Sequence, residues 1–404
     1  MRKRLPTFLK VNTIKNTLCK VGNLNLIPLI LYFMIIAVNI SFTATGFFTN
    51  DFIVNCFSRS ALQYPQHQFI YIVADGFNEK YTASKNSTVV SIGAAAKNPL
   101  RLQYQLNYKI PAILRKHKVD VCISSGGVCS LRSKVPQCMF VNDLSFFHHP
   151  ELYTKSWWRF YKKNTTKFLD KAKAVITPAE FIKNEIGTQY KTAAEKIIVA
   201  HYGTGENYTP LSWQEKEAIK ETYTEGREYF LYSGPVHLQQ NLFTLLKAFS
   251  FFKKRQKSNM QLVMASKNAV NNDFITNLAT YKYRKEVKVL DNLPAESLAK
   301  ITGAAYALVY PSGYHILGSS ITEAMQSDIP IITTNTPDAK EICGDAALYI
   351  NPKDFNDIAD KIMLLFKDEN KRNELIANGS QQAARYNWAT TAGLVWQVVA
   401  KCAG

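Results

Sequence analysis

The chain has 404 residues, of which 49 are Lys or Arg and 31 are Asp or Glu, so its formal net charge is +18. This length predicts two or three domains, and a hydrophobic share of 47% with 20% charged residues excludes a disordered, collagenous or coiled-coil chain. The seven cysteines are nowhere spaced as Cys-x-x-Cys, which argues against a structural zinc site or a disulfide framework and favours a reducing compartment.

The N-terminal region allows two interpretations. The first 33 residues carry six basic residues and no acid, and an apolar run occupies Leu26–Val38. This pattern fits a signal peptide or a short membrane anchor, although a full span needs about 20 apolar residues and Pro28 interrupts this run. Alternatively, Met34–Phe42 is the buried first strand of a parallel sheet, because such strands are continuous β-branched runs. We favour the strand, which makes residues 1–33 an N-terminal appendage, and we hypothesise that translation begins at Met34.

Short apolar runs and helical patterns then alternate along the chain. Residues 43–48 are expected to form a loop in which Gly46 permits a close approach to a ligand, and Asp51–Ser60 the next helix. Further strands are predicted at Gln68–Ala74, Val119–Ser124, Gln137–Val141, Ala174–Thr177 and Lys196–His201. After the polar linker Tyr202–Pro210, a second series is predicted at Tyr229–Ser233, Gln261–Ala265, Val287–Leu290, Ala307–Tyr310, Ile329–Thr333 and Ala347–Ile350. Two such series predict two facing, doubly wound domains with the ligand at the carboxyl ends of their strands.

A basic segment, Lys155–Lys173, contains seven basic residues and only one acid, Asp170. Its aromatic residues fall on one helical stripe: Trp157, Phe160, Tyr161 and Phe168. One interpretation is an amphipathic helix packed on its own domain, and the other is a surface that rests on anionic lipid. Both hold if the stripe packs inward while the lysines face a membrane. Nucleic acid is not an expected partner, since no helix-turn-helix, zinc-finger or RNP-type motif occurs.

The stretch Pro311–Met325 carries the most informative pattern. Its Gly318-Ser319-Ser320 loop enters a helix, where free backbone N–H groups and the positive end of the helix dipole can bind a diphosphate. Glu323, one turn into that helix, can accept hydrogen bonds from a ribose diol. The alternative is an ordinary capped helix on which Glu323 is a solvated surface residue.

From Met34 to its C-terminus the chain resembles a retaining, GT-B-fold glycosyltransferase of family 4, of the kind that assembles bacterial polysaccharides. The matching stretches occur in the family's order, at Leu131–Pro136, Val141–Ser145, Thr177–Phe181, Tyr232–Leu242, Pro311–Met325 and Gly344–Leu348. The resemblance implies an α/β fold with two facing Rossmann-like domains, an acceptor-side domain at 34–205 and a nucleotide-sugar-binding domain at 206–385. Residues 386–404, beginning with Tyr386-Asn-Trp388, resemble a terminal helix that crosses back to the first domain.

The chain departs from the family at its charged positions. The family's signature is two glutamates separated by seven residues, of which the second matches Glu323 and implies ribose binding, while the first falls on His315. A neutral histidine can hydrogen-bond a sugar hydroxyl but supplies no fixed negative charge. The basic pair that neutralises the leaving diphosphate in the family matches Gln239 and Gln240, and Lys267 is a candidate substitute by its position after a strand.

A further departure lies in the first half of the chain, where the family's His-Asp pair matches Asn142-Asp143. Asp143 is expected either to lie near the acceptor or to stabilise a turn. His148 and His149 are expected to lie in a loop and not to bind a metal ion. The resemblance thus implies catalytic candidates at His315, Asn142 and Asp143. It implies nucleotide-sugar contacts at Gly46, Gly234, Gln239, Gln240, Lys267, Gly318, Ser319, Ser320 and Glu323.

Two functions follow from these patterns. The first is transfer of a hexose, by default mannose, from a nucleotide diphosphate sugar to a saccharide or lipid-linked saccharide in cell-surface polysaccharide assembly, with no metal or other cofactor. This enzyme would be cytoplasmic and peripheral on the inner face of the membrane, through Lys155–Lys173. The alternative, motivated by Gln239, Gln240 and His315, is a catalytically impaired relative that acts as a nucleotide-binding or scaffold partner.

Overall fold

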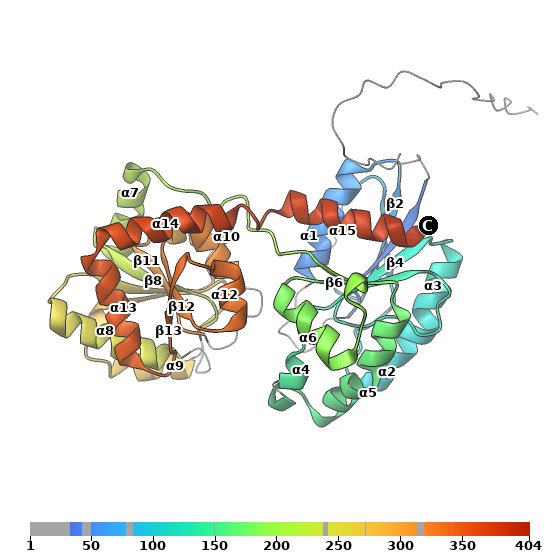
Figure 1. The fold of residues 1–404 in the computed structure, drawn as a ribbon, viewed down its shortest axis with the longest axis horizontal. Helices are drawn as coiled ribbons and strands as arrows, with labels where there is room; N and C mark the ends of the chain where they lie inside the picture. Colours follow the sequence, from blue (N-terminus) through green and yellow to red (C-terminus); the bar gives the residue numbers. More distant parts are fainter. Residues whose placement is uncertain are drawn as a thin grey trace, which may run out of the picture. The chain divides into compact units, whose positions relative to one another are not determined.

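The computed structural model describes residues 33–42, 50–77, 84–148, 150–236, 241–270, 272–312 and 319–404. Within these ranges, Met34–Gly404 forms one compact unit with two parallel β-sheets and helices packed on them (Figure 1). The first sheet has the strand order β3-β2-β1-β4-β5-β6-β7 and the second the order β10-β9-β8-β11-β12-β13. The predicted α/β fold with two doubly wound sheets is therefore confirmed.

The strands are β1 (Ile35–Asn39), β2 (Gln68–Val73), β3 (Ser87–Ser91), β4 (Val121–Ser124), β5 (Gln137–Phe140), β6 (Ala174–Thr177), β7 (Ile197–Val199), β8 (Tyr229–Ser233), β9 (Gln261–Ala265), β10 (Val287–Leu290), β11 (Ala307–Tyr310), β12 (Ile331–Thr334) and β13 (Ala347–Ile350). The helices are α1 (Asp51–Gln63), α2 (Pro99–Tyr104), η2 (Gln105–Lys109, a π-helical turn), α3 (Ile110–Lys116), α4 (Ser145–His148), α5 (Lys155–Lys171), α6 (Glu180–Tyr190), α7 (Trp213–Thr224), α8 (Leu242–Gln256), α9 (Asn272–Ala279), α10 (Ala295–Gly303), α11 (Ser319–Gln326), α12 (Pro337–Cys343), α13 (Phe355–Lys367), α14 (Glu369–Ala383) and α15 (Trp388–Ala403).

Strand β1 decides between the two interpretations of its segment. It lies inside the first sheet, paired with β2 on one side and β4 on the other. Ile36, Ala37 and Val38 are completely buried, as expected for a β-branched run covered on both faces. The strand interpretation is confirmed for these residues. Residues 1–32 lie outside the described residues, and the hypotheses of an appendage or anchor lie there with them.

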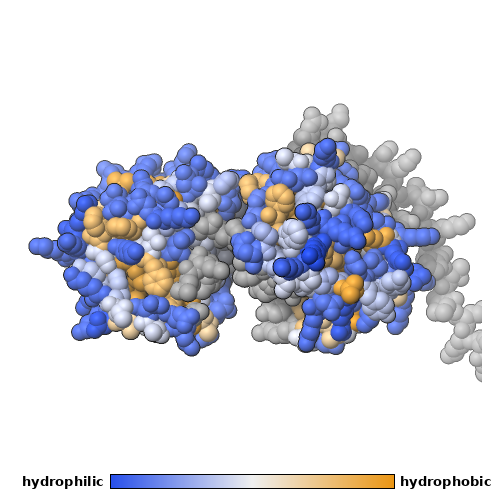
Figure 2. All heavy atoms as spheres, turned by 90° about the horizontal axis from the view of Figure 1, so that it is seen from below, coloured by the Kyte–Doolittle hydropathy of each residue, from blue (hydrophilic) through white to orange (hydrophobic). Residues whose placement is uncertain are grey.

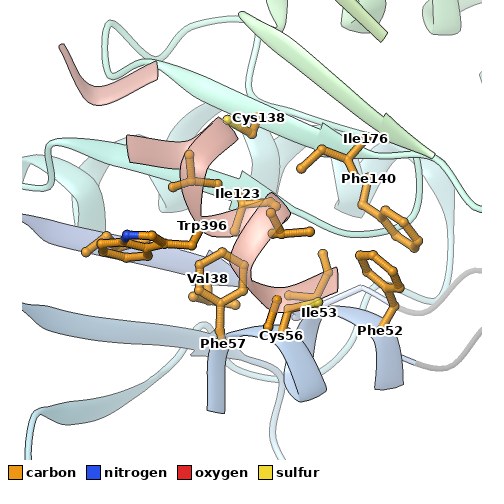
Figure 3. Packing of buried hydrophobic residues seen from close by; sticks show 14 of the residues in the cluster. Val38, Phe52, Ile53, Cys56, Phe57, Ile123, Cys138, Phe140, Ile176 and Trp396 are labelled. Atoms are coloured by element: carbon orange, nitrogen blue, oxygen red, sulfur yellow. The ribbon is translucent and has the colours of Figure 1, made fainter. Parts of the chain in front are cut away.

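The first sheet has a hydrophobic core on each face. Alternation along β1 sends Ile36 and Val38 to one face and Ala37 to the other. Helices α1 and α15 cover the first of these faces, and α2, α3, α5 and α6 cover the second. In Figure 3 the Trp396 side chain of α15 packs with residues of α1 over the strands. The last helix of the chain is therefore part of the core of the first sheet.

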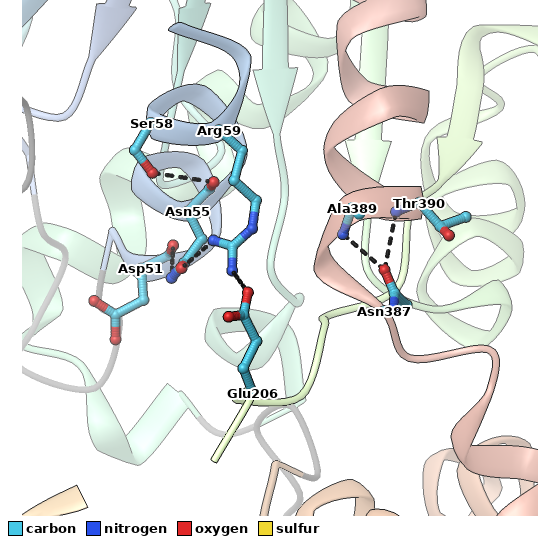
Figure 4. A network of polar contacts seen from close by, with 8 residues as sticks. All are labelled: Asp51, Asn55, Ser58, Arg59, Glu206, Asn387, Ala389 and Thr390. Atoms are coloured by element: carbon cyan, nitrogen blue, oxygen red, sulfur yellow. Dashed lines mark hydrogen bonds and ion pairs between the residues drawn. The ribbon is translucent and has the colours of Figure 1, made fainter. Parts of the chain in front are cut away.

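Two chain segments that lie far apart in the sequence meet near the start of α15. The backbone N–H of Thr204 donates to the Tyr386 carbonyl over 2.9 Å, and Gly203 is so close to Trp388 that an added Cβ would lie 2.3 Å from the indole Cγ. Asn387 caps α15 by accepting hydrogen bonds from the N–H groups of Ala389 and Thr390 (Figure 4). Only glycine fits at position 203.

An ion pair anchors the segment after β7 to the first sheet's helices. Arg59 of α1 contacts the Glu206 carboxylate over 2.8 Å, and the Asn55 side chain supports the guanidinium group (Figure 4). Glu206 belongs to the predicted polar linker, Tyr202–Pro210.

The six cysteines among the described residues are all free and buried.

The predicted basic helix is α5. Its residues Phe160, Tyr161 and Phe168 are buried against the sheet, whereas Lys163 and Lys167 are exposed. The aromatic stripe thus packs on its own domain, as the first interpretation expected, and the charges remain outside. The molecular face in Figure 2 is largely hydrophilic, with separate hydrophobic patches among polar side chains. Among the described residues, none of the helices has both the length and the apolar composition that crossing a bilayer requires.

Candidate functional site

The second sheet brings three of the predicted site residues together at the carboxyl ends of its strands. Lys267 follows β9, Gly234 follows β8, and Glu323 lies on α11, which begins at Ser319 after β11. The Gly234 N–H donates to the Ala265 carbonyl at the end of β9, which holds these two strand ends side by side. In an open parallel sheet this edge is where ligands bind.

Glu323 is the most enclosed carboxylate of this group, with an exposed fraction of 7%. Its Oε1 lies 3.6 Å from Lys267 Nζ, while the Lys267 side chain is half exposed. Burial raises the pKa of Glu323, and the charge of Lys267 and the neighbouring Tyr208 oppose that shift. The solvated-surface interpretation of Glu323 is therefore wrong: this carboxylate is held in a dry position next to a cation.

Two tyrosines complete the surroundings of Glu323. Tyr208, in the segment that follows β7, is buried, and burial together with Glu323 raises its pKa. Tyr310, at the end of β11, has its pKa raised to about 12, mainly by burial and further by Glu323. A Cβ at position 234 would come within 3.1 Å of the Tyr232 hydroxyl and 3.3 Å of the Tyr310 ring, so any larger residue would be crowded there. Sequence reasoning missed Tyr208, since nothing local marks it.

Several predicted site residues cannot be placed. Gly46, Gln239, Gln240, His315 and Gly318 lie outside the described residues. Ser319 and Ser320 are described and form the first positions of α11, where their N–H groups precede the hydrogen-bonded part of the helix. The described part of the predicted nucleotide-sugar site is therefore Gly234, Lys267, Glu323 and the two serines.

A second group of polar residues lies at the carboxyl ends of the first sheet. Asn142 is buried and its Oδ1 accepts a hydrogen bond from the Tyr202 hydroxyl over 3.1 Å. Asp143 Oδ1 accepts from the Ser145 N–H over 2.8 Å, so this aspartate stabilises the turn into α4. Both residues line a pocket with about 480 Å³ of space outside protein atoms, part of it open to solvent, together with Gly126, Gly127, Val141, Leu144, Phe146, Tyr153, Tyr161, Thr165, Leu169 and Ile186.

Sequence analysis did not identify Glu185, which lies next to this pocket on α6. Its carboxylate contacts the ring of His148 from α4. Burial and the nearby charge of Asp143 raise the pKa of Glu185 to about 7. His149 lies outside the described residues, and no cluster of three or more potential metal ligands occurs in the described part of the chain.

Two sequence models of protein families match this chain. The model described as "Glycosyl transferases group 1" matches residues 214–382, which contain the second sheet, and the model described as "Glycosyltransferase Family 4" matches residues 61–204, which contain six strands of the first. The chain belongs to the family 4 glycosyltransferases. The two matches meet close to the predicted linker, and each family model covers most or all strands of one sheet.

Curated relatives of this glycosyltransferase include two mannosyltransferases. "O-antigen chain mannosyltransferase B" from Escherichia coli is 28% identical over 249 residues, which are 61% of this chain and 65% of the relative. "O-antigen chain mannosyltransferase RfbU" from Salmonella typhimurium is 27% identical over 236 residues, 56% of this chain and 61% of the relative. The matched regions thus span less than two thirds of each relative's length.

Solved structures establish the GT-B fold. A glycosyltransferase from Rickettsia africae has a TM-score of 0.73 at 15% identity, covering 92% of this chain and 98% of that one. Anabaena HepE, solved in complex with UDP and glucose, has a TM-score of 0.70 at 14% identity, covering 91% of this chain and all of that one (100%). At this identity the likeness concerns the fold.

Proposed function

We propose that this protein transfers a hexose, with retention of configuration, from a nucleotide diphosphate sugar to a saccharide acceptor in cell-surface polysaccharide assembly. The observation that carries the proposal is the Glu323–Lys267 pair at the carboxyl edge of the second sheet. An ionised carboxylate held in a dry position can accept two hydrogen bonds from a ribose diol. A half-exposed ammonium group beside it can contact a phosphate.

The donor side is assigned to the second sheet. The N–H groups of Ser319 and Ser320 would bind the diphosphate at the start of α11. Gly234 would let the donor approach the backbone after β8 closely, because this residue has no side chain. Lys267 would offset part of the charge that develops on the leaving diphosphate, and electrostatic stabilisation of this kind often contributes more to catalysis than any other effect. His315, Gln239, Gln240, Gly318 and Gly46 remain predicted contacts of the donor sugar and phosphates.

The acceptor side is assigned to the pocket of the first sheet. Asn142 and Asp143 line it, and their amide and carboxylate groups suit the hydroxyls of a saccharide. The curated relatives are named as O-antigen mannosyltransferases, which supports mannose as the sugar and a saccharide or lipid-linked saccharide as the acceptor. With such an acceptor, we expect the enzyme to act at the cytoplasmic face of a membrane. We also expect transfer without a metal ion.

The experiment is calorimetric titration of the purified protein with GDP, UDP and ADP, followed by the mannose form of the nucleotide that binds. The expected result is binding of one nucleotide, a loss of affinity of about tenfold in Glu323→Gln, and sugar transfer that chelation of divalent metals leaves unchanged. Absence of binding to all three nucleotides would contradict the proposal and favour the scaffold alternative. Binding without turnover on any saccharide acceptor would also favour that alternative.

A further inference from the structure

The region that contains α2, η2 and α3 has an unusual charge distribution. From Lys80 to Val119 the chain has eight Lys or Arg residues and no Asp or Glu. The structured part of this acid-free stretch nevertheless packs normally, with Leu102, Leu106 and Ile110 completely or almost completely buried. Among its described basic residues, Arg101 of α2 and Arg115 and Lys116 of α3 are exposed, whereas Lys109 donates to the Ile92 carbonyl.

The outer side of α2 and η2 also exposes large hydrophobic residues. Leu100, Tyr104 and Tyr108 have exposed fractions of 79%, 54% and 51%. They are spaced four residues apart, so they follow one side of the helix. The rings of Tyr104 and Tyr108 stack with their centroids 5.5 Å apart, and the Arg132 guanidinium lies 4.4 Å from the Tyr108 ring centroid. The result is a ridge of apolar and aromatic surface with arginine beside it.

The ridge has a rigid base. Asn98 caps α2 by accepting from the Arg101 N–H over 2.9 Å. The Asn107 side chain of η2 accepts from the Leu131 N–H over 3.0 Å, which fixes the neighbouring loop that carries Arg132. The exposed side chains are thus presented by an ordered element rather than by a loop.

Helix α5 extends this surface with further positive charge. Helices α2 and α5 contact each other and bury their inner sides against the same face of the first sheet. Their outer sides therefore both point away from that face. The exposed basic residues of α5 are Lys155, Arg159, Lys162, Lys163, Lys167 and Lys171, and its one acid is Asp170. We call the outer sides of α2, η2 and α5, with Arg132, the α2–α5 surface.

We propose that the α2–α5 surface docks on an anionic lipid bilayer, with Leu100, Tyr104 and Tyr108 at the level of the lipid headgroups. Tyrosine has an apolar ring and a polar hydroxyl, which suits the boundary between acyl chains and water. Lysine and arginine around it are attracted by the surface potential of acidic lipids. An exposed leucine and two tyrosines beside exposed arginine and lysine residues have the composition of an interfacial segment, and charge attraction alone would not need the three exposed apolar side chains.

The role of this lipid contact rests on the proposed function, since a lipid-linked acceptor would lie at the same membrane. Lipid binding itself needs no transfer activity. The test is co-sedimentation of the full-length chain with vesicles of phosphatidylcholine alone and of phosphatidylcholine with phosphatidylglycerol. Binding is expected to the second vesicle only, and high salt should weaken it. Binding to both vesicles alike, or to neither, would overturn the proposal.

Variants separate this surface from every other basic part of the chain, including the first 33 residues. Arg101→Glu with Arg132→Glu should reduce vesicle affinity at least about tenfold, and Leu100→Ser with Tyr104→Ser and Tyr108→Ser about fivefold or more. The matched controls are Lys285→Glu with Lys353→Glu, and Trp213→Ser, exposed positions that belong to the second sheet's half of the chain. They should bind as the wild type does. Equal losses in test and control variants, or none in either, would overturn the assignment of the surface.

Two further readouts keep the outcomes apart. Thermal unfolding of each variant shows whether a loss of binding reflects a loss of fold. Transfer to a water-soluble saccharide acceptor should be unchanged in all surface variants, because none of these residues belongs to the donor or acceptor site. Vesicle binding without transfer would contradict the proposed function and leave the lipid surface standing, whereas transfer without vesicle binding would do the reverse.

Discussion

The ammonium group of Lys267 lies 3.6 Å from Oε1 of Glu323, so a side chain that follows β9 meets one from α11 at the edge of the second sheet. The two residues are unequal in their environment, since Glu323 is enclosed whereas Lys267 is half exposed. The carboxylate is therefore costly to keep ionised in the free protein, and the lysine can turn part of its charge toward a ligand. Such an arrangement is expected where a residue serves ligand binding rather than the stability of the fold.

Glu323→Gln should weaken nucleotide binding without destabilising the protein. The amide keeps the shape and one acceptor oxygen but cannot accept charge-assisted hydrogen bonds from both ribose hydroxyls, so we expect a loss of about tenfold in affinity. Because burial raises the pKa of Glu323, removing the ionisable group should leave the melting temperature unchanged or higher. Calorimetry and thermal unfolding measure the two effects, and a large fall in melting temperature would contradict this account.

Tyr202→Phe should impair the acceptor side through Asn142. The Tyr202 hydroxyl donates to Asn142 Oδ1 over 3.1 Å and so fixes the orientation of the buried amide. Its removal leaves that oxygen without this donor, at a cost of about 1 kcal/mol, and lets the amide rotate. The expected result is a lower kcat with nucleotide affinity unchanged. Tyr229→Phe is the matched control, because it also removes a buried hydroxyl, one that donates to the Ile301 carbonyl and not to Asn142. An equal fall in kcat in that variant would reject a positioning role.

The strands could be predicted wherever the chain is buried on both faces. The run Tyr229–Ser233 is entirely buried, and its predicted bounds are those of β8. Strand β3 was not predicted, since Ser87-Thr88-Val89-Val90-Ser91 is short, half polar and only partly buried at the edge of its sheet. An edge strand has one neighbour, so its sequence need not be apolar throughout.

The candidate site was predictable where a local pattern marks it. Glu323 and Gly234 lie in stretches that resemble family motifs, and Lys267 was singled out by its place after a strand. Tyr208 and Glu185 carry no such mark, because their relation to the site arises only when distant segments pack together. Glu185 is 37 residues from His148, and Tyr208 lies in a segment whose composition predicts only a linker.

Gly203→Ala should destabilise the fold strongly. An added Cβ would lie 2.3 Å from Trp388 Cγ and 2.4 Å from its backbone nitrogen, and the capped start of α15 leaves little room for backbone movement. Overpacking typically costs about 1–3 kcal/mol, and a contact this short is expected at the upper end of that range. Gly393→Ala in α15 is the matched control, since its Cβ would meet no atom within 4 Å and alanine favours a helix by about 0.5–1 kcal/mol. The free energy of unfolding, measured with denaturant, should therefore fall in Gly203→Ala and rise in Gly393→Ala. Similar stabilities of the two variants would contradict the close contact.

Glu185 should make the stability of the protein depend on pH. Burial and Asp143 raise its pKa from 4.5 to about 7 in the folded protein, so between these values the folded state holds a proton that the unfolded state releases. The free energy of unfolding then falls as pH rises through this window. In Glu185→Gln this contribution is absent. The melting temperature of the variant relative to that of the wild type should therefore be higher at about pH 8 than at about pH 5. A gain in melting temperature that is the same at both pH values would contradict the assignment.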